Sequence, residues 1–144
     1  MNGGKAMWEK GIKILSAVAG AVAGLYGGWS ATLSILVAVM CIDYVTGVLV
    51  ALAGKSDKTE HGGLSSRAGF YGIARKGLIM LIVLLATLLD RAVGDGAAFQ
   101  TAAAFYYIAN EGLSILENAS RMGVPFPAKL RQALEELNGP EDDE

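Results

Sequence analysis

A stripe of polar residues runs along one side of an otherwise apolar segment, residues 97–120, and it constrains the fold more than any other feature. Its members recur at helical spacing: Gln100, Tyr107, Asn110, Glu111, Ser114, Glu117, Asn118 and Arg121. Lipid cannot hydrogen-bond to amides and carboxylates, so a membrane helix must hide such groups against protein or water. The pattern therefore indicates an assembly of helices with a polar interior.

The composition is that of an integral membrane protein. The chain has 144 residues and a mean hydropathy of +0.42, and the segment 77–89 contains no charged residue. We expect an all-α fold of helical hairpins, with helices at about 12–28, 29–53, 73–92, 97–120 and 127–137. Residues 1–138 would form a single membrane domain, and residues 139–144 a disordered acidic tail.

The first four of these helices are the candidate membrane spans. The segments 29–53 and 73–92 are long enough to cross an apolar core of ~30 Å, and the short turn at 94–96 predicts a tight hairpin between 73–92 and 97–120. Lys and Arg flank the N-terminus, fill the loop 54–76 and recur after residue 120. By the positive-inside rule this favours four spans with both termini in the cytoplasm. Three spans, with 12–28 on the membrane surface, remain an alternative.

Two features inside the apolar blocks indicate close helix packing. Small residues at four-residue spacing give the segment 12–28 one face suited to a tight helix contact; they are Ser16, Gly20, Gly24 and Gly28. Asp43 lies near the middle of 29–53, where a charge costs about 2.5–3.5 kcal/mol on insertion scales, and Gly47 follows one turn later. Asp43 is either a packing or gating hub inside an oligomer, or a protonated acid bonded to its own helix.

The polar stripe has a core of five residues: Asn110, Glu111, Ser114, Glu117 and Asn118. They would line a lumen or an oligomer contact, or hold helices together; a solvated helix outside the membrane is the remaining interpretation. Arg75 and Lys76 end the basic loop and are expected at the level of the lipid headgroups, within reach of Glu117. The segment 127–137, starting at Pro127, is predicted as a short amphipathic helix on the membrane surface or against a neighbour.

No set of residues in the chain supports catalysis or a bound cofactor. His61 is the only histidine and Cys41 the only cysteine, so neither a metal site nor a nucleophile–base pair can be assembled around them. The Gly-Lys-Ser sequence at 54–56 is not a phosphate-binding loop, because the required glycine five residues earlier is Leu49. We therefore predict a protein that is not an enzyme and that has no cofactor, metal ion or nucleic-acid partner.

Several segments together match a known family pattern. They are Asp43-Tyr-Val-Thr-Gly-Val-Leu-Val-Ala51, the loop from Leu64 to Lys76, Leu89-Asp90, and Phe105 to Asn118 followed by Gly123-Val-Pro-Phe-Pro127. In these segments the chain resembles the toxin-secretion/phage-lysis holin family over about residues 30–134. The string Asn-Glu-Gly-Leu-Ser-Ile-Leu-Glu-Asn at 110–118 is the most distinctive part.

The resemblance implies a phage holin, a small multi-pass protein of the bacterial cytoplasmic (inner) membrane. Such proteins oligomerise with themselves in lipid and open lesions, through which an endolysin, or in some relatives a toxin, passes as cargo without stable binding, so that the host cell lyses. An antiholin would be a further partner. Two other classes also fit the residues. One is a small four-helix ion or drug transporter that uses Asp43 or Glu111, and the other is a non-conducting, antiholin-type regulator.

Overall fold

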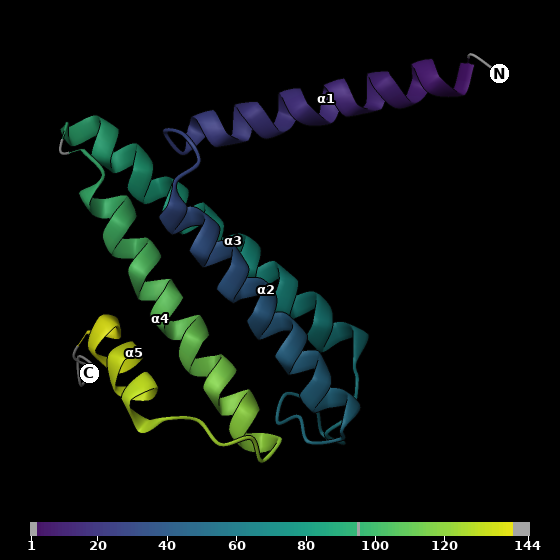
Figure 1. Cartoon of the computed structure of the whole chain (residues 1–144), viewed down its shortest axis with the longest axis vertical. Helices are drawn as coiled ribbons and strands as arrows, with labels where there is room; N and C mark the ends of the chain where they lie inside the picture. Colours follow the sequence, from purple (N-terminus) through teal and green to yellow (C-terminus); the bar gives the residue numbers. More distant parts are fainter. Residues whose placement is uncertain (1–2, 95, 140–144) are drawn as a thin grey trace. The chain divides into compact units, whose positions relative to one another are not determined.

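Five α-helices make up the regular structure of residues 3–94 and 96–139, the part of the chain that the computed structural model describes. They are α1 (Gly3–Leu25), α2 (Ala31–Leu52), α3 (Ser66–Val93), α4 (Ala98–Arg121) and α5 (Ala128–Asn138) (Figure 1). The predicted all-α class is confirmed for these residues. The predicted acidic tail lies outside them, except for Gly139.

Two helices begin well before their predicted starts. α1 begins at Gly3 instead of about 12, and α3 begins at Ser66 instead of about 73. The early start of α3 has a local cause, because the Ser65 side chain accepts a hydrogen bond from the Ala68 amide and so caps the first turn. As a result Lys76 lies ten residues inside a helix, and not at the end of a loop.

The chain divides into two compact units, Met1–Ser30 and Ala31–Glu144. The first unit consists of α1 and the turn that follows it, in which Gly27 and Gly28 take positive φ angles of 77° and 103°. α1 has no buried residues. The predicted packing role of its small-residue face therefore stays a prediction, as does the single membrane domain.

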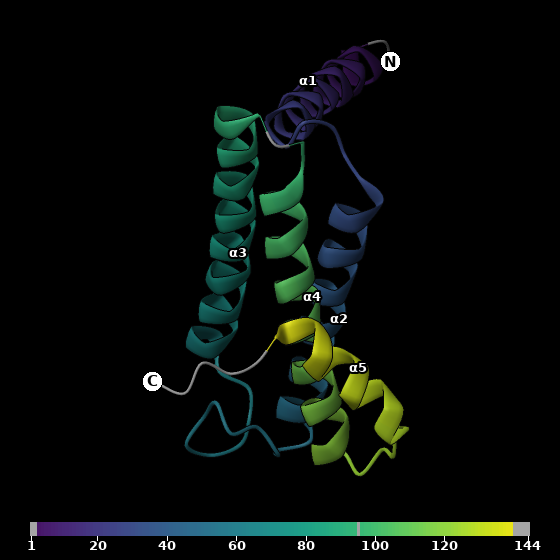
Figure 2. The same ribbon diagram turned by 90° about the vertical axis from the view of Figure 1, so that its left-hand side faces the viewer.

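In the second unit α4 is the central helix. It packs against α2, α3 and α5, whereas α2 and α3 contact each other only sparsely. Figures 1 and 2 show α4 running beside both α2 and α3, with α5 folded back along its C-terminal half. The small residue Gly112 permits this return, because a Cβ atom there would lie 2.8 Å from the Cδ2 atom of Leu134 in α5.

The hairpin between α3 and α4 is held by a carboxylate. Asp90, in the last turn of α3 and 2% exposed, accepts hydrogen bonds from the backbone amides of Phe99 and Gln100, both at 2.8 Å. Ala97, the residue at the N-cap of α4, offers no side-chain cap. Asp90 therefore satisfies amides that the helix leaves unpaired, and the side-chain amide of Gln100 donates a separate hydrogen bond to Thr87 Oγ1 on α3 at 2.6 Å.

The second unit buries polar as well as apolar side chains, and its outer faces are largely apolar. Large side chains about half exposed cover the outer faces of α2 and α3; they include Ile42, Val45, Leu49, Leu78, Leu81 and Leu85. The buried set includes six polar or charged side chains, Asp43, Thr87, Asp90, Gln100, Glu111 and Asn118. A water-soluble bundle carries mainly polar side chains on its outer faces, so these apolar faces suit a protein surrounded by lipid.

Two of the described helices, α2 and α3, are long and apolar enough to cross a membrane. α1 and α4 have comparable lengths of 23 and 24 residues but more polar compositions. For α4 the polar residues are those of the stripe. The prediction of four spans is therefore supported for two helices and stays a prediction for the other two.

Candidate functional site

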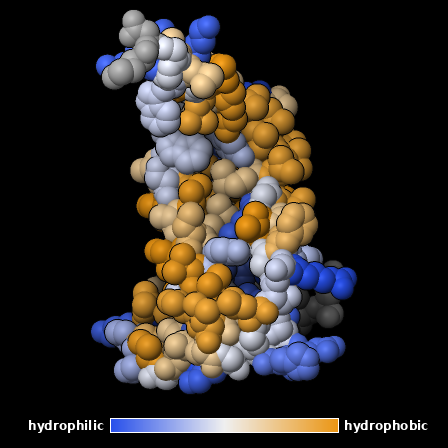
Figure 3. All heavy atoms as spheres, turned by 90° about the vertical axis from the view of Figure 1, so that its right-hand side faces the viewer, coloured by the Kyte–Doolittle hydropathy of each residue, from blue (hydrophilic) through white to orange (hydrophobic). Residues whose placement is uncertain are grey.

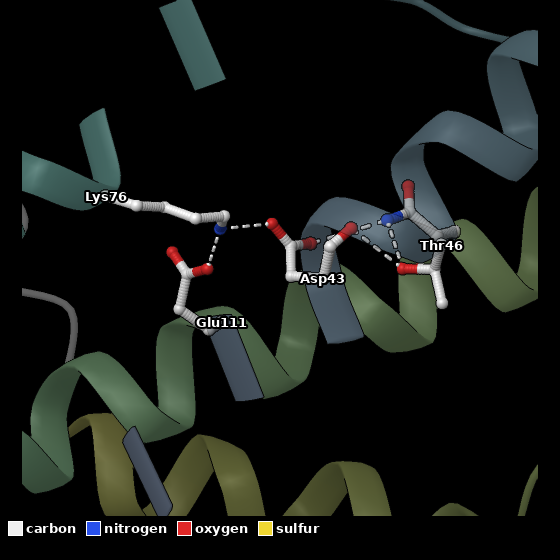
Figure 4. Close-up of polar contacts among 5 residues, drawn as sticks. Asp43, Thr46, Lys76 and Glu111 are labelled. Atoms are coloured by element: carbon white, nitrogen blue, oxygen red, sulfur yellow. Dashed lines mark hydrogen bonds and ion pairs between the residues drawn. The ribbon is translucent and has the colours of Figure 1, made fainter. Parts of the chain in front are cut away.

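The candidate site is a cluster of charged side chains at which α2, α3 and α4 meet. The ammonium group of Lys76 (α3) lies between two carboxylates, pairing with Oδ2 of Asp43 (α2) at 2.7 Å and with Oε2 of Glu111 (α4). Figure 4 shows the lysine reaching across from its own helix to these two acids. Asp43 is 7% exposed and Glu111 is 2% exposed, so this is a buried ionic network.

Amide and hydroxyl groups extend the cluster along α2 and α4. The Asn118 amide donates hydrogen bonds to Thr46 Oγ1 at 3.0 Å and to Asp43 Oδ1 at 3.4 Å. Thr46 in turn donates to the Asp43 backbone carbonyl at 3.0 Å (Figure 4). Glu111 and Asn118, the two buried polar residues in this part of α4, thus each meet a partner on another helix.

Gly47 lies beside Asn118 on the side of α2 that faces α4. A Cβ atom at Gly47 would lie 3.9 Å from the amide nitrogen of Asn118, an ordinary van der Waals distance. This is a contact within one subunit. It gives Gly47 a packing partner in the described residues.

The charges of the cluster do not cancel. Asp43 and Glu111 share one cation, which leaves one net negative charge among buried groups. A buried ionic network is weak evidence for stability, since desolvation offsets most of the attraction, but removing one partner is strongly destabilising. The cluster therefore fixes which helix faces meet, and it can be disrupted by the loss of one group.

The five stripe residues are divided between the inside and the outside of the subunit. Glu111 and Asn118 are buried in the cluster, and Asn110 and Ser114 are partly buried. Glu117 is exposed. Of the two basic residues, Lys76 belongs to the cluster and is partly buried, whereas Arg75 is exposed.

Sequence reasoning missed two features of this region. It identified Asp43 and Glu111 separately but did not pair either with Lys76, and it did not assign Thr87, Asp90 and Gln100 to a second polar contact between α3 and α4. A signal for the second contact was present. Ala97 cannot cap the helix that follows it, so an acid supplied from another part of the hairpin had to be considered as the cap.

The described residues contain no group of three or more His, Cys, Asp or Glu side chains suited to hold a metal ion. The two acids of the cluster instead face a lysine. What this arrangement offers chemically is a set of buried polar groups that hold three helices together. It contains no arrangement typical of a nucleophile and its base.

Comparison with known proteins identifies the family. The model of the bacteriophage holin family matches residues 20–139. The chain belongs to the bacteriophage holin family. The match includes α2 to α5 and every residue of the buried cluster.

The relatives of this holin-family chain come from bacteria and from a phage. It is 43% identical over 115 residues to an uncharacterised 14.9 kDa protein of Clostridium perfringens, a match that covers 79% of this chain and 82% of the relative. It is 40% identical over 129 residues to an uncharacterised protein of Halalkalibacterium halodurans, covering 86% and 90%. A protein of Bacillus phage phi105 named "probable holin" is 34% identical over 110 residues, covering 76% of each chain. No solved structure matches the chain.

Family membership and the two apolar helices together indicate a protein of the bacterial inner membrane. They also suggest a protein without enzymatic activity that assembles in that membrane. The resemblance noted from the residues is thereby confirmed, and the match begins at residue 20, about ten residues before the range of about 30–134 expected from the sequence.

Proposed function

We propose that this holin-family chain oligomerises in the cytoplasmic membrane and opens lesions through which an endolysin, or a toxin, leaves the cell. The endolysin passes as cargo and does not bind stably, and the cell then lyses. Support comes from the family match and from the phage relative named "probable holin". The observation that carries the mechanism is the Asp43–Lys76–Glu111 cluster.

The cluster suggests how one sequence can be tolerated in lipid and later form an aqueous lesion. In the isolated subunit the part of α4 that carries Glu111 and Asn118 is turned toward α2 and α3, while apolar side chains cover much of the outside. Oligomerisation would separate these faces and expose the stripe to water at the edge of a lesion. The ionic contacts of the cluster are strong only where lipid and protein exclude water. Once water reaches the charged groups it weakens these contacts and solvates the groups, which favours the opened arrangement.

For topology we propose four spans, α1 to α4, with both termini in the cytoplasm. The basic residues of the N-terminus, of the loop between α2 and α3, and of the segment after α4 would then all lie on the cytoplasmic side. α4 enters lipid because its polar side is covered by α2 and α3. Labelling of a residue near the N-terminus by an impermeant reagent in intact cells would overturn this topology.

The test of function is induced expression in bacteria together with a cytoplasmic endolysin that lacks an export signal. Abrupt lysis after a delay, only when both proteins are present, is the expected result, since only a protein-sized lesion releases the enzyme. Either protein expressed alone is the control. Continued growth with an intact membrane potential would contradict the proposal and favour a small transporter or an antiholin-type regulator.

The role of the stripe is tested with variants in the same assay. Asn110→Leu and Glu111→Leu are expected to change the time or extent of lysis, because each removes a polar group from the proposed edge of the lesion. Tyr106→Leu, on the outer face of α4 and 46% exposed, is the matched control. If both stripe variants lyse on the parental schedule, the stripe does not line the lesion.

A further inference from the structure

A hollow of about 810 Å³ opens between α2, the loop that follows it and the N-terminal half of α3. Its volume is within the range of sites that hold small ligands, about 300–1,000 Å³. Figure 3 shows hydrophilic atoms set back within a largely hydrophobic face of the molecule. The loop that forms one wall is held closed by Gly62, whose φ angle is +69° and where a Cβ atom would lie 2.2 Å from the Gly54 carbonyl oxygen.

The walls of the hollow carry more positive than negative groups. Four cationic side chains and two acids line it: Lys58, Arg67, Arg75, Lys76, Asp43 and Glu60. The Asp43–Lys76 pair is engaged in the buried cluster. None of the ion pairs found in residues 3–94 and 96–139 involves the other three cations, so they face the hollow with only Glu60 of opposite sign.

An apolar groove continues from the hollow along the gap between α2 and α3. Tyr44 and Lys76 line both, and the groove is otherwise formed by Val37, Met40, Cys41, Ile73, Gly77 and Met80. It exists because α2 and α3 contact each other only sparsely and pack instead on α4. The cationic hollow and the apolar groove are thus adjacent and share Tyr44 and Lys76 as lining residues.

The hollow lies at one end of the apolar segment of α3. Lys76 immediately precedes the charge-free run 77–89, so in a membrane the groove would extend into the hydrocarbon while the hollow stays at headgroup level. Gly69 and Gly72 leave room at this level, since an added Cβ atom would lie 3.4 Å from the Tyr44 hydroxyl oxygen at Gly69 and 3.6 Å from the Tyr44 ring at Gly72.

We propose that the hollow binds the phosphate of an anionic phospholipid, with one acyl chain lying in the groove between α2 and α3. Charge complementarity argues for this occupant, since guanidinium groups bind phosphate through paired hydrogen bonds. The apolar continuation argues for a lipid and against a free phosphate, because only an amphiphile satisfies both parts. The site is separate from the stripe's proposed role in the lesion and does not depend on it.

The test uses the full chain purified in a mild detergent and native mass spectrometry with added lipid. Phosphatidylglycerol is expected to remain bound, and phosphatidylcholine of the same acyl chains to bind at least about tenfold less, because only the first carries net negative charge. Arg67→Glu is expected to lower phosphatidylglycerol binding about tenfold or more. Lys129→Glu, the same charge change on an exposed residue of α5, is the control.

Two further arms separate the alternatives. Gly72→Leu should fill the hollow and lower binding without changing any charge, with far-UV circular dichroism to check that the helices remain. Glycerol 3-phosphate should fail to displace the lipid at equal concentration. The proposal is overturned if glycerol 3-phosphate competes equally, if both lipids bind alike, if Lys129→Glu has the same effect as Arg67→Glu, or if a folded Gly72→Leu protein binds normally.

Discussion

Substitution of Lys76 by methionine should loosen the subunit more than any other single change in the buried cluster. Lys76→Met keeps an unbranched side chain of similar length but removes the cation that Asp43 and Glu111 share. Breaking a buried ionic contact by deleting one partner costs about 3–5 kcal/mol, because the remaining charge is left uncompensated. With a tenfold change for every 1.4 kcal/mol, the equilibrium between loosened and packed subunits shifts by roughly 10²- to 10⁴-fold.

Two measurements follow from this magnitude. Lys76→Met protein in detergent should unfold at a lower temperature than the parent, as followed by circular dichroism. Cells that express this variant with a cytoplasmic endolysin should lyse earlier than cells with the parent protein, because in the proposed mechanism the packed subunit is the form present before the lesion opens. Lys129→Met, which removes an exposed lysine on α5, is the matched control and should change neither.

A compensated variant separates charge from packing. When Asp43→Asn and Glu111→Gln are combined with Lys76→Met, no charge remains buried, and most of the stability should return. If Lys76→Met is as stable as the parent, or if the compensated variant is as unstable as Lys76→Met, then the charges do not hold the helices together. The lysis schedule would then need another cause.

Three other substitutions are predicted from contacts outside the cluster. Asp90→Ala removes the acceptor of two backbone amides at the start of α4 and should lower stability by about 2–3 kcal/mol; Asp90→Asn, which keeps one acceptor oxygen, should lower it less, and equal losses would contradict the capping role. Gly112→Leu should displace α5, since Leu134 occupies the space that a side chain would need. The displacement should make proteolysis of the segment 123–127 faster than in the parent chain, which is the control. Arg121→Ala breaks an exposed pair with Asp57 and should change thermal stability by less than about 1 kcal/mol; a larger loss would show that this pair anchors the loop.

The sequence was sufficient to predict the helices and the two acids of the cluster. Apolar blocks with helical periodicity reveal spans whatever their partners, and Asp43 and Glu111 stand out because a charge is rare in such surroundings. Helix ends were less predictable. The Ser65 cap extends α3 by a full turn and more beyond the apolar block, since a helix continues as long as its amides are satisfied.

The pairing of Lys76 with Asp43 and Glu111 could not be predicted from the sequence. Beside Arg75 and with a predicted helix start at 73, it looked like one more basic residue at the membrane surface. In the structure its side chain reaches α2 and α4, whose acids lie 33 residues before it and 35 after it in the chain. Contacts of that separation depend on how three helices meet, and periodicity within one helix does not contain this information.

The cap that Asp90 provides also has a consequence for biosynthesis. The ribosome completes α3 before α4, so the acceptor is made before the Phe99 and Gln100 amides that it binds. Released alone into lipid, the end of α3 would carry an unpaired carboxylate and the start of α4 would carry unpaired amides, both costly there. The two helices are therefore suited to leave the translocon as a pair, already joined at the turn.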